Sequence, residues 1–331
     1  MTFKDLQLSP LLLKALEEKG YITPSPIQQQ AIPYALAGRD VLGCAQTGTG
    51  KTAAFALPII QNLMKPSDKK HSKKVIRSLI LTPTRELALQ IAENLNEYGS
   101  HTQVRSAVIF GGVSANPQIK ELRRGIDILV ATPGRLNDLI GQGEISLSHV
   151  EIFVLDEADR MLDMGFFDDV TKILDRIKNR TNLGLFSATI SQEVMTVSWM
   201  YQRDEVEITV APTEESKPDI DQYSITVPRL EKEEAMLRIL RSGALERVIV
   251  FCNTKVMCQR LSDDLRRAGI RADCLHGDIK QATREKTMAD FRHGKLPVLI
   301  ATDVASRGID VDDVDGVINY DVPEENEYYI H

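Results

Sequence analysis

The chain has 331 residues, of which 43% are apolar and 26% charged, and its formal net charge is −7. A chain of this length usually folds around more than one hydrophobic core, so we expect two domains. The negative charge argues against a protein that coats duplex nucleic acid through a broad basic face. There are 23 basic and 24 acidic residues up to position 208, and 17 and 23 beyond it. A narrow groove for one strand, lined by hydroxyls and helix N-termini, is still compatible with this balance.

The cysteines and the lengths of the apolar runs indicate the cellular compartment in which the protein resides. Cys44, Cys252, Cys258 and Cys274 form no CxxC pair, which argues against both disulfides and a zinc site. We expect them to be buried thiols in a reducing environment. Apolar runs stay below the ~18 residues of a membrane helix, and no signal peptide opens the chain. The sequence therefore predicts a soluble, cytoplasmic protein with no membrane partner.

Short β-branched runs alternate with helical patterns along the chain. This alternation predicts an α/β fold with mainly parallel sheets that carry helices on both faces. The segment 211–218 is polar and contains proline, which makes it the best linker candidate. We predict domains at 1–208 and 223–331, with the linker at 209–222. The expected strands are 41–44, 78–81, 104–109, 126–131, 152–155 and 183–186 in the first part, and 248–252, 272–276, 298–302 and 316–320 in the second.

A glycine-rich segment at 45–52 lies between the strand 41–44 and an apolar helical stretch at 53–57. Glycines let backbone N–H groups turn toward a phosphate chain, Lys51 adds charge at the β- and γ-phosphates, and the Thr52 hydroxyl suits Mg²⁺. The strict P-loop pattern has glycine where this chain has Ala45. A loop that only capped a helix would not explain Lys-Thr at this place. The predicted nucleotide-binding residues are Ala45, Gln46, Thr47, Gly48, Thr49, Gly50, Lys51 and Thr52.

Two adjacent carboxylates, Asp156 and Glu157, end the apolar run 152–155 and begin the segment Asp-Glu-Ala-Asp. Alone, such a pair is an ordinary polar end of a buried strand. Beside a phosphate-binding loop, one carboxylate can hold Mg²⁺ through water while the other polarises the attacking water. We therefore predict Thr52 and Asp156 as metal-binding residues, and Glu157, Asp156 and Lys51 as the catalytic residues of a nucleotide hydrolase.

Together, the segments 45–52 and 156–159 resemble the motifs of the DEAD-box ATP-dependent RNA helicases of superfamily 2, and the similarity runs from Phe3 to His331. The resemblance implies two tandem RecA-like domains that bind ATP, Mg²⁺ and single-stranded RNA between them. It also implies separation of short RNA duplexes, without sequence preference, by a monomer. The segments 1–6 and 28–33 are most similar to the bacterial RhlE-like subgroup.

The amino-terminal residues resemble the Q motif of this family. The segment 20–28 ends in Gln28, and Phe3 lies 17 residues upstream of its first glycine. An amide can both donate and accept, so Gln28 can pair with the N6/N7 edge of adenine, and Phe3 offers a face for stacking. ATP is therefore favoured over GTP. Without the downstream loop, Gln28 would be taken for an ordinary residue at a helix start.

Several segments of the first part resemble the RNA-binding motifs of this family. Each follows a strand and precedes a helix or turn, which places its polar groups at the carboxyl edge of the sheet. Helix capping is the alternative explanation for each threonine taken alone. After the strand 183–186, the hydroxyls of Ser187 and Thr189 can bond the carboxylates of the box, although a simple small-residue turn would look the same. The resemblance implies that this segment couples hydrolysis to strand separation. The predicted RNA-binding residues here are Pro83, Thr84, Arg85, Gly112, Thr132, Gly134 and Arg135.

The second part carries further matches to the family. The resemblance implies RNA contacts at Thr254, Gly277, Thr302 and Asp303, and nucleotide contacts at Gly308 and Asp310. His276 and His331 have no clustered partner, so we expect no metal there.

The last residues, 328–331, resemble the lead-in to motif VI, whose arginines reach the γ-phosphate in the family. We therefore expect the chain as given to be truncated just before that motif and incomplete in its second domain. Such a chain should bind nucleotide but turn it over poorly. An ATP-gated RNA clamp or scaffold in ribonucleoprotein assembly is the alternative function. A DNA helicase of the same superfamily is disfavoured by the Q motif and the complete box.

Overall fold

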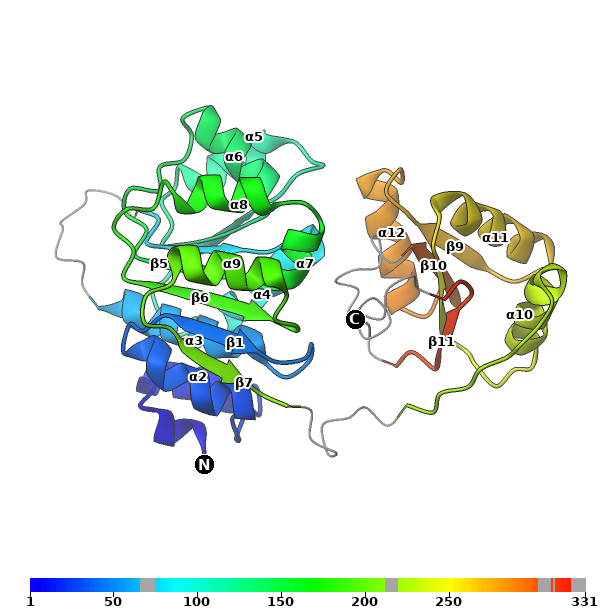
Figure 1. The fold of residues 1–331 in the computed structure, drawn as a ribbon, viewed down its shortest axis with the longest axis horizontal. Helices are drawn as coiled ribbons and strands as arrows, with labels where there is room; N and C mark the ends of the chain where they lie inside the picture. The colour runs from blue at the N-terminus through cyan, green and yellow to red at the C-terminus, as the bar shows by residue number, and fades with distance from the viewer. Residues whose placement is uncertain (66–74, 212–219, 303–310, 312, 323–331) are drawn as a thin grey trace. The chain divides into compact units, whose positions relative to one another are not determined.

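The computed structural model describes residues 1–331 except 66–74, 212–219, 303–310, 312 and 323–331. The chain divides into two units, Met1–Pro218 and Asp219–His331 (Figure 1). Each unit is built on one parallel sheet with helices on both faces. The predicted α/β class is thereby confirmed. Asp303, Gly308, Asp310 and the segment 328–331 lie outside the described residues.

The first unit contains seven described strands, which pair in the order β3-β4-β2-β5-β6-β1-β7. Every pair in this sheet is parallel. The strands are β1 (Val41–Cys44), β2 (Ser78–Leu81), β3 (Ser106–Ile109), β4 (Ile128–Ala131), β5 (Ile152–Leu155), β6 (Asn182–Ser187) and β7 (Val206–Thr209). The helices are η1 (Phe3–Leu6), α1 (Pro10–Glu18), α2 (Pro26–Leu36), α3 (Lys51–Met64), α4 (Arg85–Tyr98), α5 (Ala115–Leu122), α6 (Pro133–Gly141), α7 (Ala158–Asp163), α8 (Phe167–Leu174) and α9 (Gln192–Tyr201).

The central strands are apolar on both faces because helices cover both. Alternate residues of β5 point to opposite sides, so Val154 packs in the core beneath α2, α3 and α4, whereas Phe153 packs in the core beneath α6, α7, α8 and α9. All four residues of β2, β4 and β5 are buried. This double burial explains why these strands are continuous apolar runs rather than alternating ones.

The strand order determines which loops become neighbours. Because all strands are parallel, the loops that follow their carboxyl ends lie at one edge of the sheet. The loops after β5, β6 and β1, three adjacent strands, carry the box, the Ser-Ala-Thr segment and the glycine-rich loop. The loops after β2, β4 and β3, also adjacent, carry the segments predicted to contact RNA in this unit.

The second unit contains four described strands, which pair in parallel in the order β11-β8-β10-β9. Helices α10 and α11 cover one face through Met236 and Leu261, and α12 covers the other through Phe291. The strands are β8 (Val248–Cys252), β9 (Ala272–Leu275), β10 (Val298–Thr302) and β11 (Gly316–Asn319), and the helices are η3 (Arg229–Glu231), α10 (Lys232–Arg241), α11 (Lys255–Arg267) and α12 (Gln281–Arg292). Among the residues described in both units, no helix is long and apolar enough to cross a membrane.

Strand β7 was not expected from the sequence. Its residues pair with β1 as the last strand of the sheet, and the N–H of Val210 donates to the Cys44 carbonyl at 2.9 Å. The ordered sheet therefore runs past residue 208, and the prediction that a linker begins at 209 is corrected. The physical reason is that the strand pairing of Val206 depends on Val41, which lies near the start of the first unit and far from Val206 in sequence.

Candidate functional site

The glycine-rich loop after β1 turns sharply before α3. Gly48 and Gly50 have φ values of 82° and 84°, the left-handed region that favours glycine. Lys51 is the first residue of α3 and is only 7% exposed, and its Nζ donates to the Ala45 carbonyl at 2.5 Å. The N–H of Ala45 donates to the Ser187 carbonyl at 3.0 Å. The loop is thus folded around its own lysine and tied to the end of β6.

Gln28 lies against this loop. Its Oε1 accepts from the Ser25 N–H at 2.9 Å, and its Nε2 donates to the Gly50 carbonyl at 3.0 Å. An amide oxygen accepts two hydrogen bonds and an amide nitrogen donates two. One acceptor position and one donor position of Gln28 are therefore left for an adenine edge. The same side chain supports the phosphate loop, which the sequence did not indicate.

Phe3 does not have the exposure expected of a stacking residue. Its side chain is 4% exposed and belongs to the same buried cluster as Leu6 and Ile27. Helix η1, which carries Phe3, packs against α2. Burial of so large an apolar side chain in the core is favoured over leaving it open to solvent. In this structure Phe3 therefore supports α2 from within the core, and its stacking on adenine stays a prediction.

Asp156 is buried at the end of β5. It is 3% exposed, and its Oδ1 has no hydrogen-bond partner among the described residues. Burial, followed by the charge of the adjacent Glu157, raises the pKa of Asp156 to about 7, against the opposing effect of Lys51. A buried carboxylate oxygen without a partner is costly unless a ligand satisfies it. Asp156 therefore fits a water-mediated Mg²⁺ ligand.

Glu157 sits in an unusual backbone conformation. Its φ is +50°, and it is the N-cap residue of the short helix α7. Its Oε2 forms an ion pair with Nη1 of Arg160 at 2.5 Å, and the two side chains are only 13% and 11% exposed. Non-glycine residues in the left-handed region are uncommon and cluster at functional sites. The strained turn and the ion pair together fix the carboxylate expected to activate water.

Asp159 links the box to the end of β6. Its Oδ2 accepts from the Thr189 N–H at 2.7 Å, from the Thr189 hydroxyl at 2.8 Å and from the Ala188 N–H at 3.1 Å. Its own N–H donates to Oγ of Ser187 at 3.1 Å. Burial would raise the pKa of Asp159, but the hydrogen bonds, led by that of the Thr189 side chain, lower it. Ser187 and Thr189 thus bond the fourth residue of the box, rather than Asp156 or Glu157.

These residues fit a magnesium nucleotide. Gly48 has open space where a Cβ would stand, so a phosphate chain can approach the loop backbone. Thr52, half-buried in the first turn of α3, follows Lys51 directly. Bound Mg²⁺ would neutralise phosphate charge and orient water. Thr52 and Asp156 would hold it, Lys51 and the loop N–H groups would bind the phosphates, and Glu157 would accept a proton from water.

The loops after β2 and β4 begin helices. Thr84 is the N-cap residue of α4, and its hydroxyl oxygen accepts from the Leu87 N–H at 3.3 Å. The capping alternative therefore holds for Thr84, whose hydroxyl proton can still be donated to a phosphate. Thr132 is the N-cap residue of α6 without a side-chain cap bond, and Gly134 in the first turn is exposed. Pro83 is buried directly before Thr84.

Two arginines of this region converge on the loop after β3. The Arg85 guanidinium lies 4.3 Å from the ring centroid of Phe110. Nη2 of Arg135 donates to the Val113 carbonyl at 2.8 Å. Between these residues, Gly112 is exposed with a φ of 79°. Arg85, Gly112 and Arg135, which were predicted from three separate motifs, therefore belong to one connected region.

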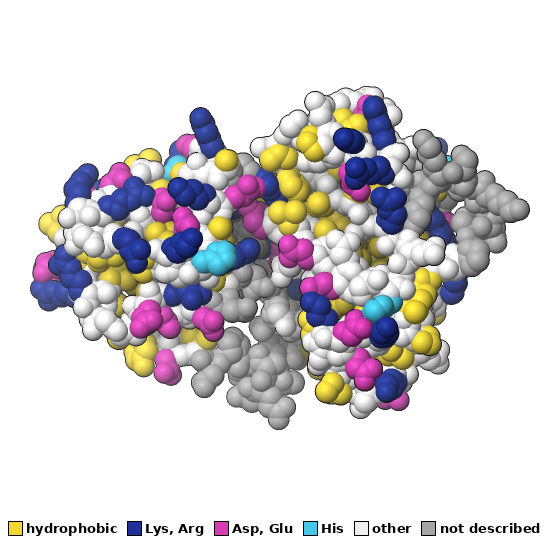
Figure 2. All heavy atoms as spheres, turned by 180° about the vertical axis from the view of Figure 1, so that it is seen from behind, with side chains coloured by type: hydrophobic (Ala, Val, Ile, Leu, Met, Phe, Trp, Pro, Cys, Tyr) yellow, Lys and Arg dark blue, Asp and Glu magenta, His cyan; other side chains and the backbone are white. Residues whose placement is uncertain are grey.

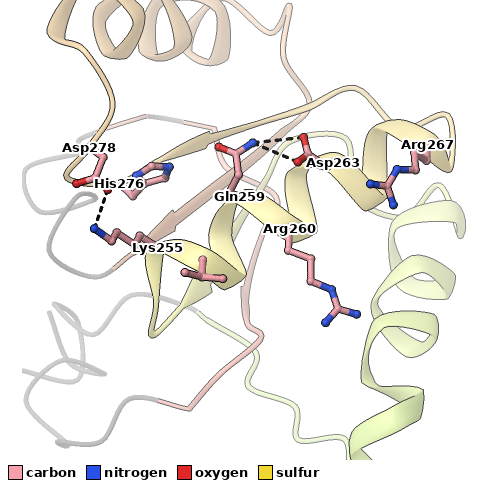
Figure 3. Close-up of a pocket in the computed structure, with 8 residues that line it drawn as sticks. Lys255, Gln259, Arg260, Asp263, Arg267, His276 and Asp278 are labelled. Carbon is pink, nitrogen blue, oxygen red and sulfur yellow. Dashed lines mark hydrogen bonds and ion pairs between the residues drawn. The ribbon is translucent and has the colours of Figure 1, made fainter.

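The predicted residues of the second unit that the structure describes, Thr254, Gly277 and Thr302, lie at the carboxyl ends of its strands. Thr254 is exposed and caps α11, accepting from the Met257 N–H at 3.2 Å; Gly277 is exposed after β9; Thr302 ends β10. A pocket of about 470 Å³ lies along α11 beside the β9 loop (Figure 3). Its labelled lining residues are Lys255, Gln259, Arg260, Asp263, Arg267, His276 and Asp278.

His276 is 8% exposed, and its ring nitrogens have no hydrogen-bond partner within the described parts of the chain. Lys255 and Asp278 form an ion pair at 2.7 Å beside it (Figure 3). No group of three or more potential metal ligands occurs in the described ranges. The four cysteines are free thiols; Cys44 is half-buried and the other three are buried.

Charges of both signs are mixed on the face shown in Figure 2. Figure 2 shows Lys and Arg side chains interspersed with Asp and Glu on the face of each unit that it presents. Ion pairs such as Arg123–Glu144, at 2.8 Å, are part of this mixture. A surface of this kind provides little general attraction for a phosphate backbone.

Two residues of the site were not predicted. Arg160 stands three residues after Glu157, and this helical spacing was the available signal for their pairing. Gln118 on α5 bonds the loop after β3 and Arg135. It carries no sequence signal, because a glutamine on an amphipathic helix is ordinary until its neighbours are known.

The raised pKa of Asp156 predicts a pH-dependent stability. From about pH 4 to pH 7 the folded protein keeps a proton that the unfolded chain releases, so the free energy of unfolding falls as pH rises. We expect Asp156→Asn, measured by urea unfolding with EDTA and no nucleotide, to gain stability relative to the wild type from pH 5 to pH 8. The gain is on the order of 1 to 4 kcal/mol, at ~1.4 kcal/mol for each pKa unit.

Asp159→Asn is the matched control. Because the pKa of Asp159 is lowered, its stabilising effect is lost only as pH falls below about 4. Its stability difference from the wild type should therefore be equal at pH 5 and pH 8. An Asp156→Asn difference that is also equal at both values would contradict the assignment.

Comparisons with known proteins give the family. Residues 25–197 match the model of the DEAD/DEAH box helicase family, and residues 231–331 match that of the helicase conserved C-terminal domain. The chain is 42% identical over 331 residues to the ATP-dependent RNA helicase DeaD of Escherichia coli K12, covering all of this chain and 52% of the relative. It is 41% identical over 331 residues to the DEAD-box ATP-dependent RNA helicase CshA of Streptococcus pneumoniae TIGR4, covering all of this chain and 62% of that relative.

Among solved structures, S. cerevisiae Dbp5 bound to RNA and ADP BeF3 matches with a TM-score of 0.85 and 32% identity, over 99% of this chain and 84% of that one. The chain spans about half the length of the DeaD relative and less than two thirds of the CshA relative. The family-model match covers more than half of the chain, and it falls on the glycine-rich loop, the box and the Ser-Ala-Thr segment described above. The chain therefore belongs to the DEAD/DEAH box helicase family.

Proposed function

We propose that the protein is an ATP-dependent RNA helicase that uses ATP and Mg²⁺ to bind single-stranded RNA and separate short duplexes without sequence preference. One observation carries the proposal. The parallel sheet of the first unit places the nucleotide loops after β5, β6 and β1 and the candidate RNA loops after β2, β4 and β3 along the same edge. Hydrolysis and RNA binding thus share one rigid platform.

The proposed roles rest on the geometry of the first unit and on the resemblance of the second unit's motifs to those of the family. Gln28 recognises adenine, Lys51 and the loop N–H groups hold the phosphates, Thr52 and Asp156 hold Mg²⁺, and Glu157 takes a proton from water. Thr189 and Ser187 couple this chemistry to the rest of the sheet edge through Asp159. The N–H groups of Ala188 and Thr189 and the Thr189 hydroxyl all donate to the Asp159 carboxylate. Thr254, Gly277, Thr302 and Asp303 contribute RNA contacts from the second unit, and Gly308 and Asp310 contribute nucleotide contacts.

RNA-stimulated ATP hydrolysis tests this proposal. We expect the complete natural protein to hydrolyse ATP faster with single-stranded RNA than without it, and to prefer RNA over DNA of the same sequence. The reason is that a groove that contacts 2′-hydroxyls distinguishes the two. Release of a short labelled duplex should require ATP and Mg²⁺. Hydrolysis that does not respond to RNA would overturn the proposal.

Residues 1–331 alone should bind nucleotide but hydrolyse it slowly, since an arginine finger contributes about 10³ to 10⁵ in rate in related phosphoryl transfers. The family places its arginines after the segment that 328–331 resembles. The RhlE-like subgroup rests on the segments 1–6 and 28–33, whereas the relatives reported above are DeaD and CshA proteins. A cytoplasmic location and a monomeric state are further proposals.

An ATP-gated RNA clamp is the second candidate. It is favoured by the two hydrogen bonds between Asp159 and Thr189. These bonds would transmit nucleotide binding from the box to the loops that bind RNA, and this does not require strand separation. A duplex-release assay beside an RNA-residence assay separates the two functions. A clamp retains RNA for long periods and releases few duplexes, whereas a helicase releases duplexes at a rate that follows ATP hydrolysis.

A further inference from the structure

Hydrogen bonds join the loop after β3 to α6, a cation–π contact adds Arg85 from the loop after β2, and the residue at the centre of the hydrogen bonds lies outside all the motifs. The side chain of Gln118, on α5, contacts the loop after β3 and the first turn of α6. Neither the glycine pair before it nor the Thr-Pro-Gly-Arg segment after it includes this residue. It is half-buried rather than exposed.

The side chain of Gln118 hydrogen-bonds both the N–H and the carbonyl of Phe110. Its Oε1 accepts from the Phe110 N–H at 3.2 Å, and its Nε2 donates to the Phe110 carbonyl at 3.1 Å. The preceding residue, Ile109, uses its carbonyl toward β4 by accepting from Thr132. The backbone of Phe110 therefore faces the open side of β3, which is the edge strand of the sheet. The Gln118 amide makes the two hydrogen bonds that a neighbouring strand would otherwise make with Phe110.

The same glutamine holds one of the candidate RNA arginines. Nη1 of Arg135 donates to Gln118 Oε1 at 3.2 Å, while Nη2 donates to the Val113 carbonyl at 2.8 Å. On the other side of the loop, Arg85 stacks over the Phe110 ring at 4.3 Å. Both arginines thus depend on the position of a backbone segment whose end is fixed by Gln118.

We propose that Gln118 is a positioning residue for RNA, which fixes the segment 110–113 so that Arg85, Gly112 and Arg135 form one preorganised phosphate-binding surface. This inference rests on the proposed RNA function. Without the two bonds to Phe110, the loop would be ordered only when RNA binds, and that ordering would reduce affinity. Arg135 would also lose one of the two anchors of its guanidinium.

Gln118→Met tests the proposal, because methionine has similar length and flexibility but makes neither hydrogen bond. The matched control is Asn116→Met, which changes an exposed amide on the same helix. Binding of a fluorescent single-stranded RNA is measured in the complete protein with a non-hydrolysable ATP analogue and Mg²⁺. We expect Gln118→Met to weaken RNA binding about tenfold, as the loss of one or two hydrogen bonds implies. Affinity for the ATP analogue should match that of the control.

The salt dependence separates positioning from general destabilisation. The logarithm of the binding constant falls linearly with the logarithm of the salt concentration. Loss of one phosphate contact makes this line less steep, by about 0.7 for a single strand. We expect this decrease in Gln118→Met but not in Asn116→Met. In combination with Arg135→Met, the loss of RNA affinity should be smaller than the product of the two separate losses, because both changes remove the same contact.

Gln118→Asn provides a second variant that keeps the amide but is one methylene too short to reach Phe110. It should also weaken RNA binding and lower the salt slope, whether or not the methionine variant folds. The proposal is overturned if either folded variant binds RNA with the affinity and salt slope of Asn116→Met. Absence of RNA binding by the wild type in the same titrations would instead overturn the proposed function.

Discussion

Glu157→Gln is expected to lower RNA-stimulated ATP hydrolysis by about 10² to 10⁴, the usual contribution of a general base, while ATP and RNA still bind. Glutamine has the size of glutamate but cannot take a proton from water. The carboxylate lies in a strained turn, is 13% exposed and is paired to Arg160. Because hydrolysis would release the RNA, the variant should form a long-lived complex with ATP and RNA, measured by its dissociation rate.

The control for this variant is Glu193→Gln, the same chemical change at an exposed position of α9. It should hydrolyse ATP and release RNA at wild-type rates. Rapid RNA release by Glu157→Gln, or a hydrolysis rate close to that of the control, would show that another group accepts the proton.

Gly50→Ala is expected to weaken ATP binding on the order of 100-fold, or about 2.8 kcal/mol at ~1.4 kcal/mol per factor of ten. A Cβ at this position would lie 2.3 Å from Nε2 of Gln28, and the φ of +84° is itself unfavourable for an L-residue. Either the loop or the amide must move, and both belong to the candidate nucleotide site. Fluorescent-nucleotide titration measures the effect.

Gly143→Ala isolates the collision from the backbone strain. Gly143 has a φ of +75°, no atom lies within 4 Å of its Cβ position, and it stands after α6 outside the nucleotide loops. Both variants should lose ~1 to 2 kcal/mol of folding stability from the left-handed conformation. Only Gly50→Ala should lose nucleotide affinity. Equal nucleotide affinity in the two variants would mean that Gln28 does not support the phosphate loop.

Much of the secondary structure could be predicted. Strands 41–44, 78–81, 152–155, 248–252 and 298–302 are confirmed to the residue, because each is a short apolar run that is buried on both faces or bounded by polar turns. The predicted strands 104–109 and 126–131 begin two residues later in the structure. Their first residues are apolar, yet they pack in the core before the ladder begins. Apolar character reports burial rather than strand pairing.

Strand β7 and the core position of Phe3 could not be predicted for a shared reason. The segment Val206–Thr209 is short and half-polar, and its strand character depends on a partner about 165 residues earlier in the chain, Val41–Cys44. Phe3 is buried because η1 packs against α2. Local patterns carry no information on such distant contacts.

The residue types alone were sufficient for the chemistry of the first unit: a glycine loop with Lys51 and Thr52, paired carboxylates after an apolar strand, and an amide suited to adenine each have few other uses in combination. The arrangement required the tertiary structure. Strand order made neighbours of loops that are about 140 residues apart in sequence, as when Ala45 bonds Ser187. It also placed Gln118 against Phe110, turned Asp159 rather than Asp156 toward Thr189, and buried Asp156 until its pKa rose. Hydrogen bonds and desolvation depend on which atoms come within about 3 Å of one another. In this protein that proximity is created by long-range parallel pairing, which a linear pattern of residues does not contain.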